Sequence, residues 1–457
     1  MAQLSFDKTR EIIDDFVKVI NERKTEGSAP KMDVINFRDD KIVGRERPIY
    51  NVPIELLRYR KDNGRIASDV LSYEKVHLKE LDEKDDNTQK ILFEFLKRDD
   101  PEKTEVLKRA IQSEGQDEPA IITCDGFLIN GNRRRMVLQL LSEEDDPSKY
   151  STMKVIILPG KGDPGGPPTI KEIELIENRY QLQQDGKSEY KGLNRALSIL
   201  RKINCGISLE DQLLDDPSCG GLKKNSKEFK KKIDEVYKNL LKPLERAEAY
   251  LAYLERPGYY DSIKDRWQAF IDFSNFYNGN LQDHAWQIKA SISEDDIGTI
   301  QDVAFKIIRK QTIKGEIPRK LHQIIRDIPK FMLIEEAQRN LLNISDEVKE
   351  LTNKEKLGED GKELDFDDQD IRWGEVNKGI FERCINKAYG CFSRQEEESN
   401  PLKLIIGAFD KLTHKNMNIQ KIPIDKLTDF VKDADKVIQK ATELRSDAWY
   451  RKKNRCD

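Results

Sequence analysis

The stretch GKGDPGGPP at residues 160–168 divides the chain into two parts with different patterns. Neither a helix nor a strand tolerates this density of glycine and proline, so we expect a linker here. Before it, residues 31–160 alternate short β-prone runs with helical stretches. After it, leucines and isoleucines recur every three or four residues among charges, which indicates helices. The sequence therefore predicts an α+β domain followed by a mostly α-helical middle and C-terminal region.

Further breaks refine this organisation. Apolar residues at helical spacing between Phe6 and Arg23 predict an N-terminal amphipathic helix. The acidic stretch EDGKELDFDDQD, residues 359–370, is typical of an exposed loop. The aromatic run at 259–279 is expected to form the core of a helix pair. The segments expected are an N-terminal helix in 1–30, the mixed domain in 31–160, a helical region in 169–255, a helical domain in 256–358 and a helical bundle in 371–457.

Composition limits the classes of function. The chain has 457 residues, and 80 Lys and Arg against 84 Asp and Glu give a formal net charge of −4, so any nucleic-acid contact must use a local basic face. No apolar run reaches the roughly 20 residues of a membrane span, which predicts a soluble cytoplasmic protein. The six cysteines form no CxxC pair and the four histidines share no helical spacing, so neither a metal site nor a disulfide framework is expected.

The stretch DGFLINGNRRRMVLQLL, residues 125–141, sets three arginines at a helix start. Asp125-Gly126 is a two-residue hairpin signal, which predicts that 120–124 pairs with 127–130. Four apolar residues then fall on one face of a helix that begins near Asn132: Met136, Val137, Leu140 and Leu141. This periodicity places residues 133–135 in the first helical turn.

Cations in a first helical turn are unfavourable, since they oppose the helix dipole by about 0.3–1 kcal/mol each at exposed sites. A bound anion would reverse this effect, because unpaired N–H groups, dipole and guanidinium groups would converge on it. Gly131 would let the backbone approach closely. The alternative is that the arginines are solvated or pair with acids such as Glu143 and Glu144.

Residues 107–141 resemble the N-terminal domain of the ParB family of chromosome- and plasmid-partition proteins, which has the ParB/sulfiredoxin fold. The order of elements is similar: a helix ends at Gly115, residues 116–121 open a strand, and a hairpin and a Gly-x-Arg-Arg turn lead into a helix. In that family the Gly-Glu-Arg-Arg turn binds phosphate, and CTP-binding members use it for the triphosphate. The resemblance implies an N-terminal domain of this fold.

By this resemblance Gly131, Asn132, Arg133 and Arg134 form a site for the phosphates of CTP or another NTP with Mg²⁺. The family's acid is Asn132 in this chain. An amide can cap a helix or face an anion, but it cannot act as a general base. The departure favours binding over hydrolysis.

Two flanking segments extend the resemblance to about residues 48–205. VPIELLRYRKDNGRIA, residues 52–67, resembles the family's first strand and its Asn/Arg loop, which implies that Arg58, Arg60, Asn63 and Arg65 reach the same pocket; an exposed basic loop is the alternative. ELIENRYQ, residues 174–181, resembles the Glu-Asn-x-x-Arg box that opens the helical middle region. It implies that Glu177 and Asn178 face the nucleotide, and Glu177 is the best spare acid for catalysis.

A lysine-rich segment follows where ParB-like proteins have a helix-turn-helix. Helices are expected at about 188–204 and 208–214, with Ser208 as N-cap, and from Asn225 onward. Residues 223–242 hold eight lysines and three acids, a local charge of +5. Such a face would bind DNA phosphates without base readout; a solvated helix face is the alternative. The DNA-binding residues expected are Lys223, Lys224, Lys227, Lys230, Lys231 and Lys232.

Three functions remain open at this point. The first is a DNA-binding, oligomerising protein that takes a nucleotide or a DNA phosphate. The second is an enzyme on the same fold, such as a nucleotidase, kinase or nuclease, because fold alone does not decide activity. The third is an adaptor with a partner protein in a partition, mobile-element or phage-defence system.

Overall fold

The computed structural model describes residues 8–26, 31–35, 37–38, 46–182, 192–214, 219, 222–311, 319–399, 401–415 and 417–453. The chain splits into two compact units, Met1–Ala388 and Tyr389–Asp457. Most described residues are helical and a small mixed sheet lies in the first unit, which confirms the α+β class. Within the described ranges, no helix combines the length and apolar character needed to cross a membrane.

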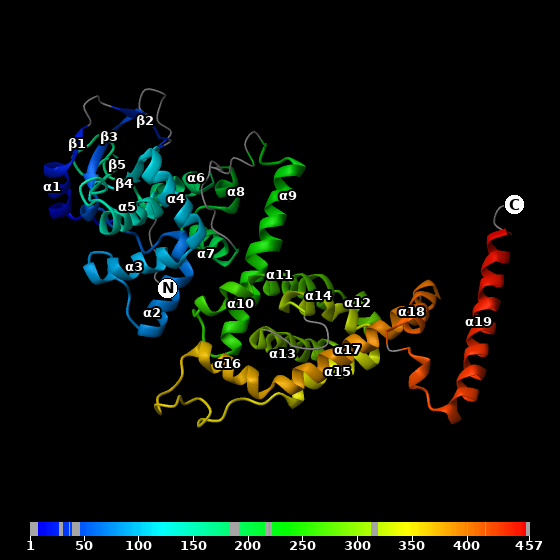
Figure 1. Ribbon diagram of the computed structural model, residues 1–457. Helices are drawn as coiled ribbons and strands as arrows, with labels where there is room; N and C mark the ends of the chain where they lie inside the picture. The colour runs from blue at the N-terminus through cyan, green and yellow to red at the C-terminus, as the bar shows by residue number, and fades with distance from the viewer. Residues whose placement is uncertain are drawn as a thin grey trace. The chain divides into compact units, whose positions relative to one another are not determined.

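The sheet has the strand order β1-β3-β5-β4, with β2 also paired to β3. Its strands are β1 Thr25–Glu26, β2 Met32–Val34, β3 Glu46–Pro53, β4 Ala120–Ile122 and β5 Thr152–Ile157. Strand β3 runs antiparallel to β5, and β4 runs parallel to β5. The parallel pair requires a crossover, and the helix after the arginine turn provides it. Figure 1 shows this helix, α5 (Asn132–Glu144), beside the strands.

Most of the N-terminal helices share a core with the sheet. Their bounds are α1 Asp14–Arg23, α2 Ala67–His77, α3 Asp86–Arg98, α4 Pro101–Glu114 and α5 Asn132–Glu144. Leu92 and Leu96 of α3 and Met136 of α5 lie in one core with residues of β3, β4 and β5. The expected N-terminal helix is shorter than predicted: residues 8–13 are not helical, and Phe6 lies outside the described residues.

The predicted hairpin is confirmed. Thr123 donates its N–H to the Phe127 carbonyl at 2.9 Å, and Ile122 forms an antiparallel bridge with Leu128. Gly126 has φ +84°, and a Cβ there would lie 2.6 Å from the Leu56 carbonyl oxygen. Glycine is therefore required at this turn.

The middle region has the helices α6 Ile170–Leu182, α7 Gly192–Asn204, α8 Leu209–Leu214 and α9 Lys227–Val236. Ser208 accepts from the Asp211 N–H at 3.1 Å, as the sequence predicts, and Ser226 accepts from the Phe229 N–H at 3.1 Å. The buried Phe229 joins α9 to the apolar sides of α7 and α8. A four-residue connection with Gly206 at φ +75° separates α7 from α8.

Helices make up most of the described residues in the rest of the first unit. They are α10 Lys242–Tyr253, α11 Trp267–Phe276, α12 His284–Lys289, α13 Glu294–Lys310, α14 Leu321–Phe331, α15 Glu335–Glu347, α16 Phe366–Val376 and α17 Lys378–Ser399, which continues into the second unit. Phe270, Phe273 and Phe276 are buried, so the aromatic run is core as predicted. Tyr250 and Phe305 meet Phe270 and Phe273 through edge-on ring contacts.

The acidic stretch 359–370 is not a loop throughout, which corrects the prediction. From Phe366 onward it is the start of α16, capped by the Asp365 side chain. Asp370 is buried and pairs with Arg256 at 3.0 Å and Arg309 at 2.8 Å, from other helices. The arginine partners of Asp370 are far away in the sequence. The local pattern of acidic residues is therefore the same as that of a solvated loop.

The second unit contains the end of α17, then α18 Pro401–Thr413 and α19 Leu427–Lys453. Two short 3-10 turns, Ile419–Lys421 and Ile424–Lys426, precede α19. No residue of α19 is buried, and all of its 27 residues are described.

Candidate functional site

The turn before α5 depends on Gly131. This residue is the N-cap of α5 and has φ +83°. A Cβ at this position would lie 2.6 Å from the Ala120 Cβ and 3.1 Å from the Met153 Cε. Both the left-handed backbone and the close approach to β4 and β5 therefore require glycine. The turn fixes the direction in which the next three side chains leave the sheet.

Arg133 binds an aspartate at the junction of α3 and α4. It donates to Asp99 Oδ2 at 2.9 Å and to the Asp99 carbonyl oxygen at 2.9 Å. Arg65 donates to the same Oδ2 at 3.2 Å. Asp100 caps α4 in a left-handed conformation, with φ +58°, which turns the chain sharply at this point. One carboxylate oxygen thus lies between two guanidinium groups from separate segments.

The other two arginines of the triplet have different environments. Arg134 donates to the Glu118 carbonyl oxygen. Arg135 is buried, lies 4.1 Å from the Tyr59 ring centroid and donates to the Ile54 carbonyl oxygen. The alternative that the arginines pair with acids is confirmed for Arg133. Its partner, however, is Asp99, and the predicted partners Glu143 and Glu144 are wrong for this residue.

Electrostatics at the turn favour an anion. Burial and the neighbouring Arg65 guanidinium lower the pKa of Arg133 to about 10. Burial also lowers the pKa of Arg134. Both shifts mean that the positive charges are poorly solvated, and that Asp99 beside Arg133 and Glu118 beside Arg134 offset them only in part. A second anion, or one of higher charge in place of Asp99, would stabilise them further.

Asn132 brings an unpaired polar atom to the same turn. Its side chain is buried, and Oδ1 has no hydrogen-bond partner within the protein. Nε of Arg133 is likewise buried without a protein partner. A buried polar atom of this kind costs about 1–3 kcal/mol unless water, an ion or a ligand satisfies it. One donor and one acceptor therefore remain for a ligand at the turn.

The 58–66 loop is held by a buried ion-pair network. Arg60 donates to Glu174 Oε1 at 2.9 Å and to Glu177 Oε2 at 3.3 Å, and all three residues are buried. Burial opposes the charge on Arg60, but Glu174 and Glu177 outweigh it and raise the pKa of Arg60. Arg201 of α7 also donates to Glu174. Arg60 is thus a paired interior residue, which differs from the alternative of an exposed basic loop.

Glu177 has both carboxylate oxygens in contact with the loop. Oε1 accepts from the Gly64 N–H at 3.0 Å, while Oε2 faces Arg60. Asn63 is buried and caps the short turn that follows it, because its Oδ1 accepts from the Arg65 N–H at 3.0 Å. These contacts give Glu177 a positioning role, since both of its carboxylate oxygens accept hydrogen bonds from the 58–66 loop.

Asn178 joins three helices of the middle region. It accepts from Lys202 Nζ of α7 at 3.1 Å and donates to the Gln212 carbonyl oxygen of α8 at 3.0 Å. Asn194 of α7 donates to the Arg65 carbonyl oxygen at 2.6 Å. Hydrogen bonds therefore connect the loop that carries Arg65 to the helices that precede the lysine-rich segment.

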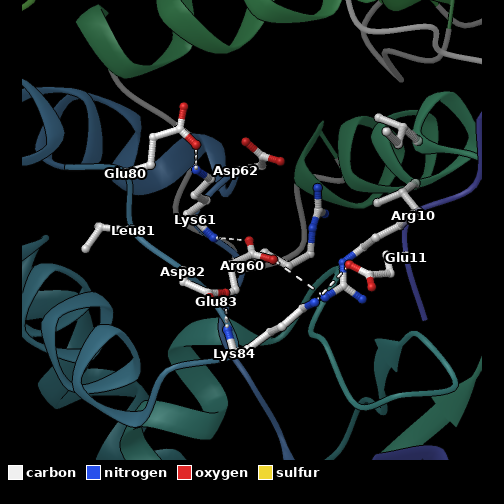
Figure 2. Close-up of a pocket in the computed structure, with 12 residues that line it drawn as sticks. Arg10, Glu11, Arg60, Lys61, Asp62, Glu80, Leu81, Asp82, Glu83 and Lys84 are labelled. Carbon is white, nitrogen blue, oxygen red and sulfur yellow. Dashed lines mark hydrogen bonds and ion pairs between the residues drawn. The ribbon is translucent and has the colours of Figure 1, made fainter. Parts of the chain in front are cut away.

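A cavity of about 420 Å³ lies on the Arg60 side of the 58–66 loop (Figure 2). Both signs of charge line it. Its lining residues are Arg10, Glu11, Arg60, Lys61, Asp62, Glu80, Leu81, Asp82, Glu83, Lys84, Ile170 and Ile173. Burial and the nearby Asp62 raise the pKa of Glu83. Among the described residues, no group of three or more His, Cys, Asp or Glu is arranged to hold a metal ion.

The lysine-rich segment is exposed over most of its length. Lys223, Lys224, Lys227, Lys230 and Lys231 are exposed and Lys232 is half-buried. Lys224 pairs with Asp211 at 2.9 Å, and Lys232 lies 3.5 Å from Glu235. Such exposed pairs are weak, so the lysines remain free to exchange these partners for phosphates.

The structure brings Arg65 and Arg133 of the predicted site together at Asp99, and it brings Arg60, Glu177 and Gly64 together beside them. The sequence prediction missed Asp99, Glu174, Arg201 and Asn194. For Asp99 there was a partial signal: Asp-Asp-Pro at 99–101 marks a helix start, but it does not tell which distant arginines face it.

Comparisons with protein-family models, curated proteins and solved structures find no match for the chain. What supports a function is therefore the set of contacts at the 131–134 turn and along the loop and helices joined to it.

Proposed function

We propose that the chain is a ParB-like DNA-binding protein whose 131–134 turn binds the phosphates of a nucleotide. The observation that carries the proposal is the shared carboxylate: Arg65 and Arg133 both donate to Asp99 Oδ2. Two guanidinium groups on one oxygen anion at a helix N-terminus form the arrangement that recognises phosphate. A phosphate would take the place of the Asp99 carboxylate between the two guanidinium groups.

The unpaired atoms at the turn fit such a ligand. Arg133 Nε can donate to a phosphate oxygen, and Asn132 Oδ1 is an amide oxygen of the kind that Mg²⁺ accepts as a ligand. A triphosphate bound with Mg²⁺ supplies both an anion and a cation, so CTP or another NTP suits the pair better than a lone phosphate does. We propose binding without hydrolysis, since Asn132 is not a base and both oxygens of Glu177 are engaged.

Backbone and amide hydrogen bonds connect the loop that carries Arg65, beside the 131–134 turn, to the helices proposed to bind DNA. The Arg65 carbonyl is bound by Asn194 of α7, and α7 and α8 pack against α9 around Phe229. A ligand that moves Arg65 away from Asp99 would shift the segment that Asn194 holds. Exposed lysines of α9 would then contact DNA phosphates in a nucleotide-dependent way.

Thermal unfolding with each of the four NTPs and Mg²⁺ tests the proposal. We expect one or more NTPs to raise the Tm of the wild-type chain. Arg133→Ala should weaken the binding about 10- to 100-fold, the effect of one charge-assisted hydrogen bond pair. Arg109→Ala, at an exposed arginine of the neighbouring α4, is the matched control and should bind normally. No response of the wild-type chain to any NTP would contradict the proposal.

A further inference from the structure

Helix α19 presents an apolar stripe that is exposed to solvent. Val431, Val437, Ile438 and Leu444 are 55%, 47%, 64% and 43% exposed. All of these residues lie on a single 27-residue helix in which no residue is buried. Isolated exposed apolar residues are ordinary, but a continuous stripe along a helix of this length marks a contact surface.

The stripe follows a seven-residue repeat. With the positions of each repeat written a to g, the two core positions a and d are apolar for three repeats, and the flanking position e is apolar in the first two. Position a holds Leu427, Ala434, Ala441 and Ala448, position d holds Phe430, Val437 and Leu444, and position e holds Val431 and Ile438. Apolar a and d positions over three repeats are the seam of a coiled coil.

The sizes of the core residues favour an antiparallel pair of identical helices. In a parallel pair, a residues meet a residues, and three alanine layers would leave poorly filled space. In an antiparallel pair, a residues meet d residues, so small side chains meet large ones. With Ala434 opposite Val437 of a second copy, Ala441 meets Phe430 and Leu427 meets Leu444. The two-fold symmetry of such a pair repeats each of these layers.

The charges beside the seam agree with the same register. Position g holds Asp433, Lys440 and Asp447. In the antiparallel register Asp433 lies beside Lys440 of the second copy, and by symmetry Lys440 lies beside Asp433. Asp447 lies beside Lys426, which directly precedes α19. On the other flank Val431 meets Ile438, which accounts for the apolar e positions.

A parallel pair lacks this complementarity. It would set Lys440 against Arg445 of the second copy and Asp447 against Lys452, so that repulsion and attraction cancel. We therefore propose that α19 pairs with α19 of a second copy of this chain, antiparallel, with Ala434 facing Val437. The interface is independent of the nucleotide site and would hold whether or not the 131–134 turn binds a ligand.

Another candidate for the same stripe is α18 of the same chain. Leu404, Ile405 and Phe409 of α18 are 44%, 46% and 64% exposed. A hairpin of α18 and α19 would cover the stripe within one chain and leave the protein monomeric. The oligomeric state of the full-length chain therefore separates the two arrangements.

Sedimentation equilibrium of the full-length chain, which gives the dimer dissociation constant, tests the proposal with variants that reverse the charge of Asp433 or of Lys440. Asp433→Lys sets lysine against lysine at two symmetric contacts, and Lys440→Asp sets aspartate against aspartate. We expect each variant to raise the dimer dissociation constant about tenfold. An equimolar mixture of the two variants should restore the wild-type constant, because the mixed dimer pairs opposite charges at both contacts.

Controls must separate these contacts from pairs within the helix. Asp433 also pairs with Lys436 at 2.8 Å, and Lys440 with Glu443 at 3.2 Å. Lys436→Ala and Glu443→Ala remove these pairs at position c, outside the seam, and should leave the constant within about twofold of wild type. A monomeric wild-type chain would overturn the proposal in favour of α18. The proposal would also be overturned if neither charge change raises the dimer dissociation constant, or if mixing the two variants does not restore the wild-type constant.

Discussion

Arg65 and Arg133, which are 68 positions apart in the chain, donate to one and the same oxygen, Oδ2 of Asp99, at 3.2 and 2.9 Å. Both guanidinium groups are largely covered, with side chains 12% and 11% exposed. Like charges this close and this poorly solvated need a shared anion. Asp99 supplies one inside the protein, and this relationship makes the turn a site that can exchange an internal anion for an external one.

Removal of the internal anion should make the protein depend on an external one. We expect Asp99→Ala to lower the free energy of unfolding by about 1–3 kcal/mol in phosphate-free buffer, because two partly buried cations lose their partner. Added pyrophosphate should then raise the Tm of the variant more than that of the wild-type chain. Differential scanning fluorimetry measures both effects.

The control for this experiment is Asp117→Ala, at an exposed aspartate close by. It should leave both the Tm and the response to pyrophosphate near wild type. If pyrophosphate stabilises Asp99→Ala and the wild-type chain equally, Asp99 does not occupy the anion position.

Gly131 can be compared with a second glycine of positive φ. Gly131 has φ +83° and a Cβ would lie 2.6 Å from the Ala120 Cβ, whereas Gly115 has φ +78° and no atom within 4 Å of its added Cβ. Gly115 has ψ −163°, a conformation that is essentially restricted to glycine, so Gly115→Ala should cost about 1–3 kcal/mol through backbone strain alone. Gly131→Ala should cost about 2–4 kcal/mol, since overpacking is added to the strain of about 1 kcal/mol in its left-handed backbone. Urea denaturation gives both values, and a cost of only about 1 kcal/mol for Gly131→Ala would contradict the close packing of the turn.

The sequence predicts the turn well because its signals are local. A hairpin dipeptide, a glycine and an apolar repeat within seventeen residues fix where α5 begins. It does not predict Asp99 as the partner of Arg133, since the two meet only after α3, α4 and the sheet pack together. Asp370 shows the same limit: its arginine partners Arg256 and Arg309 lie on other helices, and no local pattern distinguishes such an acid from a solvated one.

The start of α6 gives the protein a source of acid sensitivity. Burial opposes ionisation of Glu172, but hydrogen bonds from Arg38 and Thr169 outweigh it and lower the pKa of Glu172 below 4.5. Arg38 Nε lies 2.6 Å from Glu172 Oε1, and the same arginine donates to the Gly165 carbonyl oxygen. This pair fixes the linker and the helix that carries Glu174 and Glu177.

Because the pKa is lower in the folded than in the unfolded state, the contribution of Glu172 to stability is complete above about pH 5 and is lost as pH falls through and below 4.5. Glu172→Gln should therefore be less stable than wild type at pH 7, and the difference should shrink toward pH 3. Urea midpoints at pH 7, 5, 4 and 3 measure it. Glu102→Gln, in the first turn of α4, is the control. A difference that stays constant with pH would contradict the assignment.

The lysine-rich segment should determine how DNA affinity responds to salt. Charge reversal at Lys230, Lys231 and Lys232 should weaken DNA binding and reduce the slope of log affinity against log salt by about 2–3, roughly one for each lost phosphate contact. Electrophoretic mobility shifts or fluorescence anisotropy at several salt concentrations give that slope.

The same reversal at three lysines elsewhere in the first unit, Lys289, Lys349 and Lys354, tests whether net charge alone is responsible. All three are exposed, so the two triple variants carry the same change in total charge. A general charge effect would lower the affinity of both variants alike. A DNA contact at α9 should instead reduce the slope only in the variant with reversed Lys230, Lys231 and Lys232, and an unchanged slope in that variant would mean that the lysines of α9 form a solvated face.

The nucleotide should also act on DNA binding, because Asn194 links Arg65 to α7. The nucleotide that stabilises the wild-type chain should change the salt slope of the wild-type chain and leave the salt slope of the α9 variant unchanged.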